Sequence, residues 1–212
     1  ETVAVVAKST RFRQDGQVDG CNGVNDPQAW PSVFEERNNC IQATPIHPHG
    51  HAFPIPVTLD LADWTCILKE GDICLGVHIP AVGGMEHGDC GASFAAAIPF
   101  FSRHFPELEI KAFTCTSWLL DNQFCAILPP RSNIVRFLRE WYLAPNPGGS
   151  DAQALDRIFG GPIADLDAAP QGTSLQRAVI AHMKAGKRCR DSAAFFFPHD
   201  LPWGHEAYRK DC

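Results

Sequence analysis

A group of polar side chains lies between Phe113 and Phe137, where an apolar strand pattern gives way to turns and helices. It contains a Cys-x-Ser-Trp cluster, an apolar run that ends at Asp121, and a Pro-Pro-Arg-Ser-Asn corner. Loops held on a rigid scaffold carry a large share of binding and catalytic residues. This segment is therefore our first candidate for a functional site.

Four side chains in and near this segment suit proton transfer or the stabilisation of a developing anion. His78 ends an expected strand just before Pro80, and its imidazole could act as a general base or simply bind a loop carbonyl. Cys115 and Ser117 are two residues apart and share one face of an extended chain, where either could donate to an oxyanion. Ser117 also suits a helix N-cap. Asp121 could orient His78, or it could be a solvated carboxylate in a first helical turn.

A second set of side chains suits the binding of a carboxylate or phosphate, with arginine as the forked donor. The candidates are Ser132, Asn133, Arg136 and Arg177. The alternative for the Ser-Asn pair is a turn in which asparagine satisfies its own backbone. Thr173 and Gln176 have the spacing of a capping box, so the segment around Arg177 is mostly structural.

The rival interpretation is a metal site at His47, His49 and His51. On an extended backbone these alternating residues would place three imidazoles on one face, as zinc and copper sites require. Pro48 and Gly50 suit a plain turn equally well, and the sequence identifies no fourth ligand. A metal-dependent enzyme therefore stays an alternative, and the leading interpretation has no metal.

Composition and charge limit the possible partners. With 212 residues, 45% of them apolar, the chain can bury a large core. A net charge of −6 disfavours nucleic acid as the main partner, because phosphate binding needs a basic face. No apolar run is long enough to cross a membrane, and the sequence lacks the pattern of a signal peptide. We expect a processed or trimmed cytoplasmic protein.

The cysteines indicate a reducing compartment. There are 9 of them, an odd number, and no C-x-x-C pair occurs, so neither a disulfide framework nor a zinc ribbon is predicted. Cysteines with apolar neighbours are expected to be buried thiols, and the terminal Cys212 is expected to be exposed. The expected buried thiols are Cys66, Cys74, Cys90 and Cys125.

The elements that must position these residues alternate between strands and helices. An irregular polar arm is expected over residues 11–39. Apolar periodicity predicts strands at 2–7, 55–59, 73–79, 108–113 and 193–197. It predicts helices at 60–68, 89–104, 117–128, 151–159 and 173–185, with Pro99 kinking or shortening the second. Residues 134–143 fit either type. This order predicts an α+β, or mixed α/β, fold in which helices pack on a mixed sheet.

Several motifs in this order give the chain a recognisable resemblance. They are VHIPAVGG (77–84), SFAAAIPFFSRHFPE (93–107), Cys-x-Ser-Trp-Leu-Leu-Asp (115–121), Ser-Asn-Ile with Arg-Phe (132–137) and TSLQRA (173–178). Residues 45–72 fit the entry to the same domain. From residue 45 to residue 197, the chain resembles the C-terminal domain of bacterial acyltransferase-like proteins related to the GNAT superfamily.

The resemblance implies a GNAT-like mixed sheet and a division into an N-terminal strand and arm (1–44) and an acyltransferase C-terminal domain (45–212). It implies transfer of an acyl group from acyl-CoA, as co-substrate, to an amine of a small molecule. His78, Cys115, Ser117 and Asp121 would then line the reactive end, and the second set of side chains would bind the anionic part of the ligand. A separate N-terminal domain or a homo-oligomer would be a possible partner.

The sequence departs from this family in one respect. GNAT enzymes hold pyrophosphate with an Arg/Gln-x-x-Gly-x-Gly/Ala loop at a helix N-terminus, where free N–H groups suit phosphate. No such loop is evident; Gly160 and Gly161 follow a probable helix rather than precede one. A third interpretation is therefore a non-catalytic partner domain of a split acyltransferase, with an exposed sheet edge.

Overall fold

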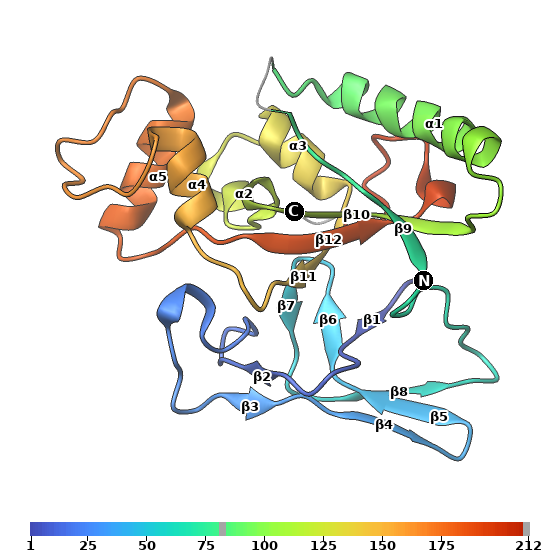
Figure 1. Cartoon of the computed structure of the whole chain (residues 1–212). Coiled ribbons are helices and arrows are strands. Elements are labelled where there is room, and N and C mark those ends of the chain that lie inside the picture. The colour runs from blue at the N-terminus through green and yellow to red at the C-terminus, as the bar shows by residue number, and fades with distance from the viewer. Residues whose placement is uncertain (81–83, 210–212) are drawn as a thin grey trace.

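The computed structural model describes residues 1–80 and 84–209 of the chain. Figure 1 shows a helix-covered sheet made by the part of the chain after Asp72, above a smaller unit made by short N-terminal strands. The combination confirms the predicted α+β fold. In the described part of the chain, no helix has both the length and the apolar character needed to cross a bilayer.

The larger sheet has the strand order β11-β12-β10-β9. Its strands are β9 (Ile73–Gly76), β10 (Ile110–Ser117), β11 (Tyr142–Pro145) and β12 (Ser192–Phe196). Strands β9 and β10 are parallel and are joined by helix α1 (His87–His104), whereas the other pairs are antiparallel. A helical crossover is the usual link between parallel neighbours, so the two strands end at the same edge of the sheet.

Four further helices follow β10 along the chain. They are α2 (Phe124–Ile127), α3 (Asn133–Arg139), α4 (Ala152–Phe159) and α5 (Ser174–Lys184). Short 3₁₀ turns are η1 (Cys21–Gly23), η2 (Trp118–Leu120) and η3 (Pro198–Asp200). Figure 1 shows α1 and α3 over one face of the sheet, with α4 and α5 together at the end where β10 runs into η2.

Aromatic side chains fill the core between the sheet and α1. Phe94 of α1 lies 5.2 Å from Phe113 of β10 and 5.0 Å from Phe196 of β12, measured between ring centroids. Trp141 is completely buried against the same cluster. Burial of each such ring contributes about 1.5–3 kcal/mol, so this cluster fixes α1 over the strands that it connects.

The N-terminal unit consists of three small antiparallel sheets. Their strands are β1 (Ala4–Val5), β2 (Arg11–Phe12), β3 (Trp30–Pro31), β4 (Phe34–Arg37), β5 (Cys40–Ala43), β6 (Pro45–His47), β7 (His51–Ala52) and β8 (Val57–Asp60). Tyr142 of β11 connects this unit to the larger sheet: its hydroxyl donates to the carbonyl of Ile46 and accepts from the N–H of Ala4. Strand pairing between β1 and β6 crosses the expected domain boundary after residue 44, which stays a prediction.

Most of the predicted elements are present, and two are wrong in form. The helix expected over 60–68 is absent: Asp60 ends β8, and its carboxylate accepts from the N–H of Ala62 in a single turn. The helix expected over 117–128 is divided into η2 and α2. The ambiguous stretch 134–143 contains both types, the end of α3 and the start of β11.

The cysteines are free thiols wherever the structure describes them. Cys74, Cys90 and Cys125 are partly buried, but Cys66 is exposed because the loop that carries it does not form the predicted helix. The expectation for Cys212, and the middle of the 77–84 motif, lie outside the described residues.

Candidate active site

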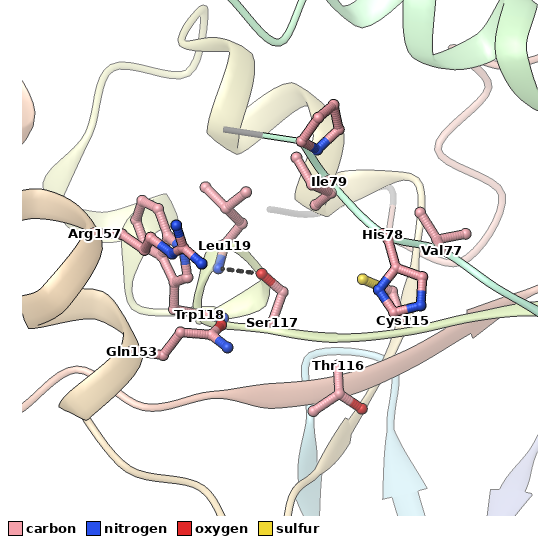
Figure 2. A pocket seen from close by; sticks show the side chains of 11 residues that line it. Val77, His78, Ile79, Cys115, Thr116, Ser117, Trp118, Leu119, Gln153 and Arg157 are labelled. Carbon is pink, nitrogen blue, oxygen red and sulfur yellow. Dashed lines mark hydrogen bonds between the residues drawn. The ribbon is translucent and has the colours of Figure 1, made fainter. Parts of the chain in front are cut away.

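The site lies where β9 and β10 stop pairing. The two strands are in register through Gly76 and Thr114, and the N–H of Val77 donates to the carbonyl of Thr114 over 2.8 Å. Beyond this bond, no backbone hydrogen bond joins the two segments within the described residues. The chain after Val77 rises toward Ile79, whereas β10 continues into η2 (Figure 2).

The separation exposes backbone groups that a continued sheet would pair. Alternate residues of a strand direct their N–H and C=O groups to the same neighbour. Because the N–H of Val77 is bonded to the carbonyl of Thr114, an extended chain would direct the corresponding groups of Ile79 and Thr116 toward the gap. Across the gap these groups have no backbone partner within the described residues, so the gap suits an extended ligand that carries amides.

A cavity of about 370 Å³ occupies the gap. It is lined from the β9 side by residues 77–80, from the β10 side by residues 115–119, and from helix α4 by Gln153 and Arg157. His78, Cys115 and Ser117, three of the four predicted catalytic residues, therefore share one cavity (Figure 2). His78 is exposed, so its imidazole can reach a ligand from solvent.

Burial controls the chemistry of Cys115. The side chain is 5% exposed, and desolvation raises the pKa of its thiol to about 11. The thiolate is the nucleophilic form of cysteine, and it is scarce far below the pKa. Cys115 can therefore pack against a ligand or donate weakly from sulfur, but it is a poor nucleophile at neutral pH.

Ser117 both caps η2 and lines the cavity. Its oxygen accepts a hydrogen bond from the N–H of Leu119 over 3.2 Å, which confirms the predicted capping role. Accepting leaves the hydroxyl proton available, and the described residues give it no acceptor. Ser117 can therefore donate to a ligand while it ends the strand.

The comparisons with known proteins agree with this geometry. A model of the GNAT-like C-terminal domain matches residues 10–196. This chain belongs to the GNAT-like C-terminal domain family. Among curated proteins, none matches it.

Solved acyltransferase structures are similar to this GNAT-like domain. One, in complex with decanoyl-CoA, is 29% identical, with a TM-score of 0.55, and the match covers 78% of this chain and 46% of that one. A second, in complex with decanoyl-CoA and teicoplanin, is 31% identical, with the same TM-score and coverage. The GNAT-like domain thus spans about half the length of these acyltransferases.

Asp121 lies apart from the other predicted catalytic residues of the GNAT-like domain. It is fully buried and does not line the cavity. Its carboxylate accepts from the backbone N–H groups of Gln123 and Arg190, each over 3.0 Å, and lies 3.8 Å from the Arg190 guanidinium. Desolvation, partly offset by Arg190, raises the pKa of this carboxyl. Its partners join η2 to the segment before β12, and none of them is His78.

The predicted anion-binding residues separate into two places. Ser132 caps α3, Asn133 donates to Glu86 over 3.1 Å, and Arg136 lies 3.1 Å from the Nδ1 of His87. These contacts place the first turns of α1 and α3 side by side. Arg177 lies elsewhere, because it donates to the carbonyls of residues 171 and 172 beside the confirmed Thr173 capping box.

A second cavity, of about 240 Å³, lies between the end of β9 and the first turns of α1. It shares residues 77–80 with the first cavity, and its floor includes Phe94 and Phe137. Glu86 and Asp89 line it as well. His78 therefore borders both cavities, one largely polar and one with an apolar floor.

The three histidines of the rival interpretation come together, but the rings of His47 and His51 stack and the ring of His49 meets that of His47 edge-on. His47 pairs with His51 across the β6–β7 hairpin, and their rings are 4.8 Å apart and nearly parallel. The Nδ1 of His47 accepts from the N–H of His49. Burial, followed by the neighbouring His47, lowers the pKa of His51. In the described chain, no three His, Cys, Asp or Glu side chains are arranged to hold a metal ion.

Helix α4 contributes two polar residues to the first cavity that were not predicted as site residues. Gln153 and Arg157 come from α4, on the far side of the cavity from His78. They are one helical turn apart and so lie on one face of α4, but their sequence does not show that this face meets the end of β10. The N–H of Trp118 donates to the Gln153 side chain over 3.1 Å and makes that connection.

Proposed function

We propose that this chain is an acyl-CoA-dependent acyltransferase domain that transfers an acyl group to an amine of a small molecule. The separation of β9 and β10 supports this most directly. The pantetheine arm of CoA is extended and carries two amides, so it can pair with the free groups of Ile79 and Thr116 as a strand would. The similar acyltransferases were solved with decanoyl-CoA, octanoyl-CoA or CoA, which supports a thioester ligand for this chain too.

The reaction would take place beside His78. The acceptor nitrogen forms a bond to the thioester carbonyl carbon while His78 removes the proton from that nitrogen. The N–H of Ile79 and the hydroxyl of Ser117 would donate to the oxyanion. The carbon–sulfur bond then breaks, and the CoA thiolate leaves with a proton returned by the imidazole. Cys115 forms no covalent intermediate, because its thiol is protonated at neutral pH.

The phosphates of CoA would lie at Arg136, which is outside the second cavity, because Glu86 and Asp89 make the lining of that cavity acidic. Free N–H groups at a helix N-terminus favour anions, and the Arg136 guanidinium lies next to His87, the first residue of α1. In this arrangement Ser132, Asn133 and Arg136 act together. Arg177 has no evident part in it. The free cysteines are consistent with a reducing cytoplasm.

Calorimetry with the whole chain tests the proposal. We expect decanoyl-CoA and CoA to bind with one-to-one stoichiometry, and replacement of Arg136 by Gln to weaken both several-fold, the loss of one charge-assisted contact. Arg103, exposed at the other end of α1, provides the matched control. If neither thioester nor CoA binds, the proposal fails.

An open sheet edge favours a second candidate, a partner domain of a composite acyltransferase. In the described chain β9 has a neighbouring strand only on the β10 side, and Ile73 is 43% exposed. An unpaired edge of this kind is a template for another strand. Absence of CoA binding by the chain alone, together with self-association in light scattering, would favour this candidate.

A further inference from the structure

The two cavities differ in the charge of the side chains that line them. In the first cavity, Arg157 is the only side chain with a permanent charge among the lining residues, and none of them is acidic. The second cavity has the opposite character, with Glu86 and Asp89 in its lining and no lysine or arginine. The whole chain carries a net charge of −6, whereas the described lining of the first cavity contains one cation and no carboxylate.

Arg157 is free enough to bind a ligand. Among the described residues it forms an ion pair only with the adjacent Asp156, at 3.9 Å, and its side chain is 56% exposed. Figure 2 shows its side chain on the same side of the cavity as the Gln153 amide. The Gln153 oxygen already accepts from the N–H of Trp118, so the NH₂ end remains as a donor.

We propose that Arg157 and Gln153 form a subsite for a carboxylate on the acyl acceptor. This inference rests on the proposed acyl transfer and adds the acceptor class: an amine that also bears a carboxylate, such as an amino acid or peptide. A guanidinium fork matches a planar carboxylate, and a side-chain amide adds a further donor. Ser117 and His78 line the same cavity on the side of the separating strands β9 and β10, where the amine would meet the thioester.

Binding of matched product analogues tests this inference without depending on turnover. N-decanoylglycine carries the carboxylate, and N-methyldecanamide has the same amide without it. We expect the wild-type chain to bind N-decanoylglycine about tenfold more tightly, as for one partly screened charge-assisted pair. Arg157→Gln should abolish this preference and leave the affinities for N-methyldecanamide and CoA unchanged. Arg103→Gln, far from the cavity, should keep it.

The outcomes separate the two proposals. If decanoyl-CoA binds but the wild-type chain shows no preference, or if Arg157→Gln retains the preference, the carboxylate subsite is wrong and acyl transfer stands. If Arg157→Gln weakens CoA binding as well, Arg157 holds a CoA phosphate and the acceptor assignment is overturned. Absence of decanoyl-CoA binding would contradict both the acyl-transfer proposal and the carboxylate subsite. A Gln153→Glu variant, which places a carboxylate opposite the ligand, should reverse the preference and provides an independent check.

Discussion

At the scale of single residues, the account depends first on His78. Its place at the tip of β9, beside both cavities, is the geometric reason to treat it as the base. Replacement of His78 by Ala should lower the transfer rate about 10²-fold, the lower end for general acid–base catalysis. Because the side chain is exposed, the melting temperature should stay the same.

Initial rates with decanoyl-CoA and an amine acceptor measure this effect. His104→Ala, an exposed histidine at the other end of α1, is the matched control and should retain full activity. Full activity in the His78 variant would exclude the imidazole from proton transfer.

Cys115 gives a prediction about the order of the chemical steps. Burial raises the pKa of its thiol to about 11, so at pH 7.5 almost no thiolate is available to attack a thioester. Intact-mass spectrometry after incubation with decanoyl-CoA should show no acyl adduct at this position. A stoichiometric adduct that forms and decays with turnover would instead require a two-step mechanism.

At the scale of elements, three carboxyl groups, those of Asp121, Asp151 and Asp191, interact near the segment before β12. Asp191 is partly buried close to Asp121 and Asp151, and desolvation followed by Asp121 raises its pKa from 3.8 to about 6. One of its carboxylate oxygens is buried without a hydrogen-bond donor. Between these two pH values the folded protein binds more protons than the unfolded chain, so its stability falls as the pH rises through that window.

Asp191→Asn should therefore raise the melting temperature at pH 7.5 and have no effect at pH 4. After allowance for solvent screening we expect about 1 kcal/mol, or roughly 2–4 °C for a chain of this size. Thermal melts at the two pH values measure it, with the exposed Asp63→Asn as control. An equal shift at both would mean that the effect does not come from titration.

Local sequence determined some elements better than others. The α5 capping box and the Pro-bearing α1 follow from short-range patterns, and both are present. The helix expected over residues 60–68 is absent for a tertiary reason. Its apolar face would need a surface to pack against, yet Ile67 remains 47% exposed. Helix stability in proteins comes mainly from such packing.

Sequence also placed His78, Cys115 and Ser117 in one neighbourhood, because parallel strands joined by a helix end at the same edge of a sheet. It did not place Asp121 correctly relative to His78. The reason is the break between η2 and α2, which directs the Asp121 carboxylate toward Arg190, a residue far along the chain. Nor did it reveal Arg157, since contact between α4 and η2 is a long-range feature.

At the scale of the whole molecule, the chain matches the GNAT-like C-terminal domain over residues 10–196 but spans only about half of the similar acyltransferases. The open edge of β9 faces away from β10, whereas both cavities are lined by residues 77–80, which follow the end of β9. We therefore expect the chain to bind a thioester by itself, and any further strand to add at β9 without blocking the gap to β10.

The central claim is that the gap between β9 and β10 receives the pantetheine arm, and amide hydrogen exchange measured by NMR tests it most directly. Addition of CoA should slow exchange at Ile79 and Thr116 at least tenfold, because both N–H groups would gain acceptors or lose access to water. The amide of Val77, already bonded to Thr114, should change little. Unchanged exchange at Ile79 and Thr116, with CoA bound elsewhere on the chain, would contradict the account.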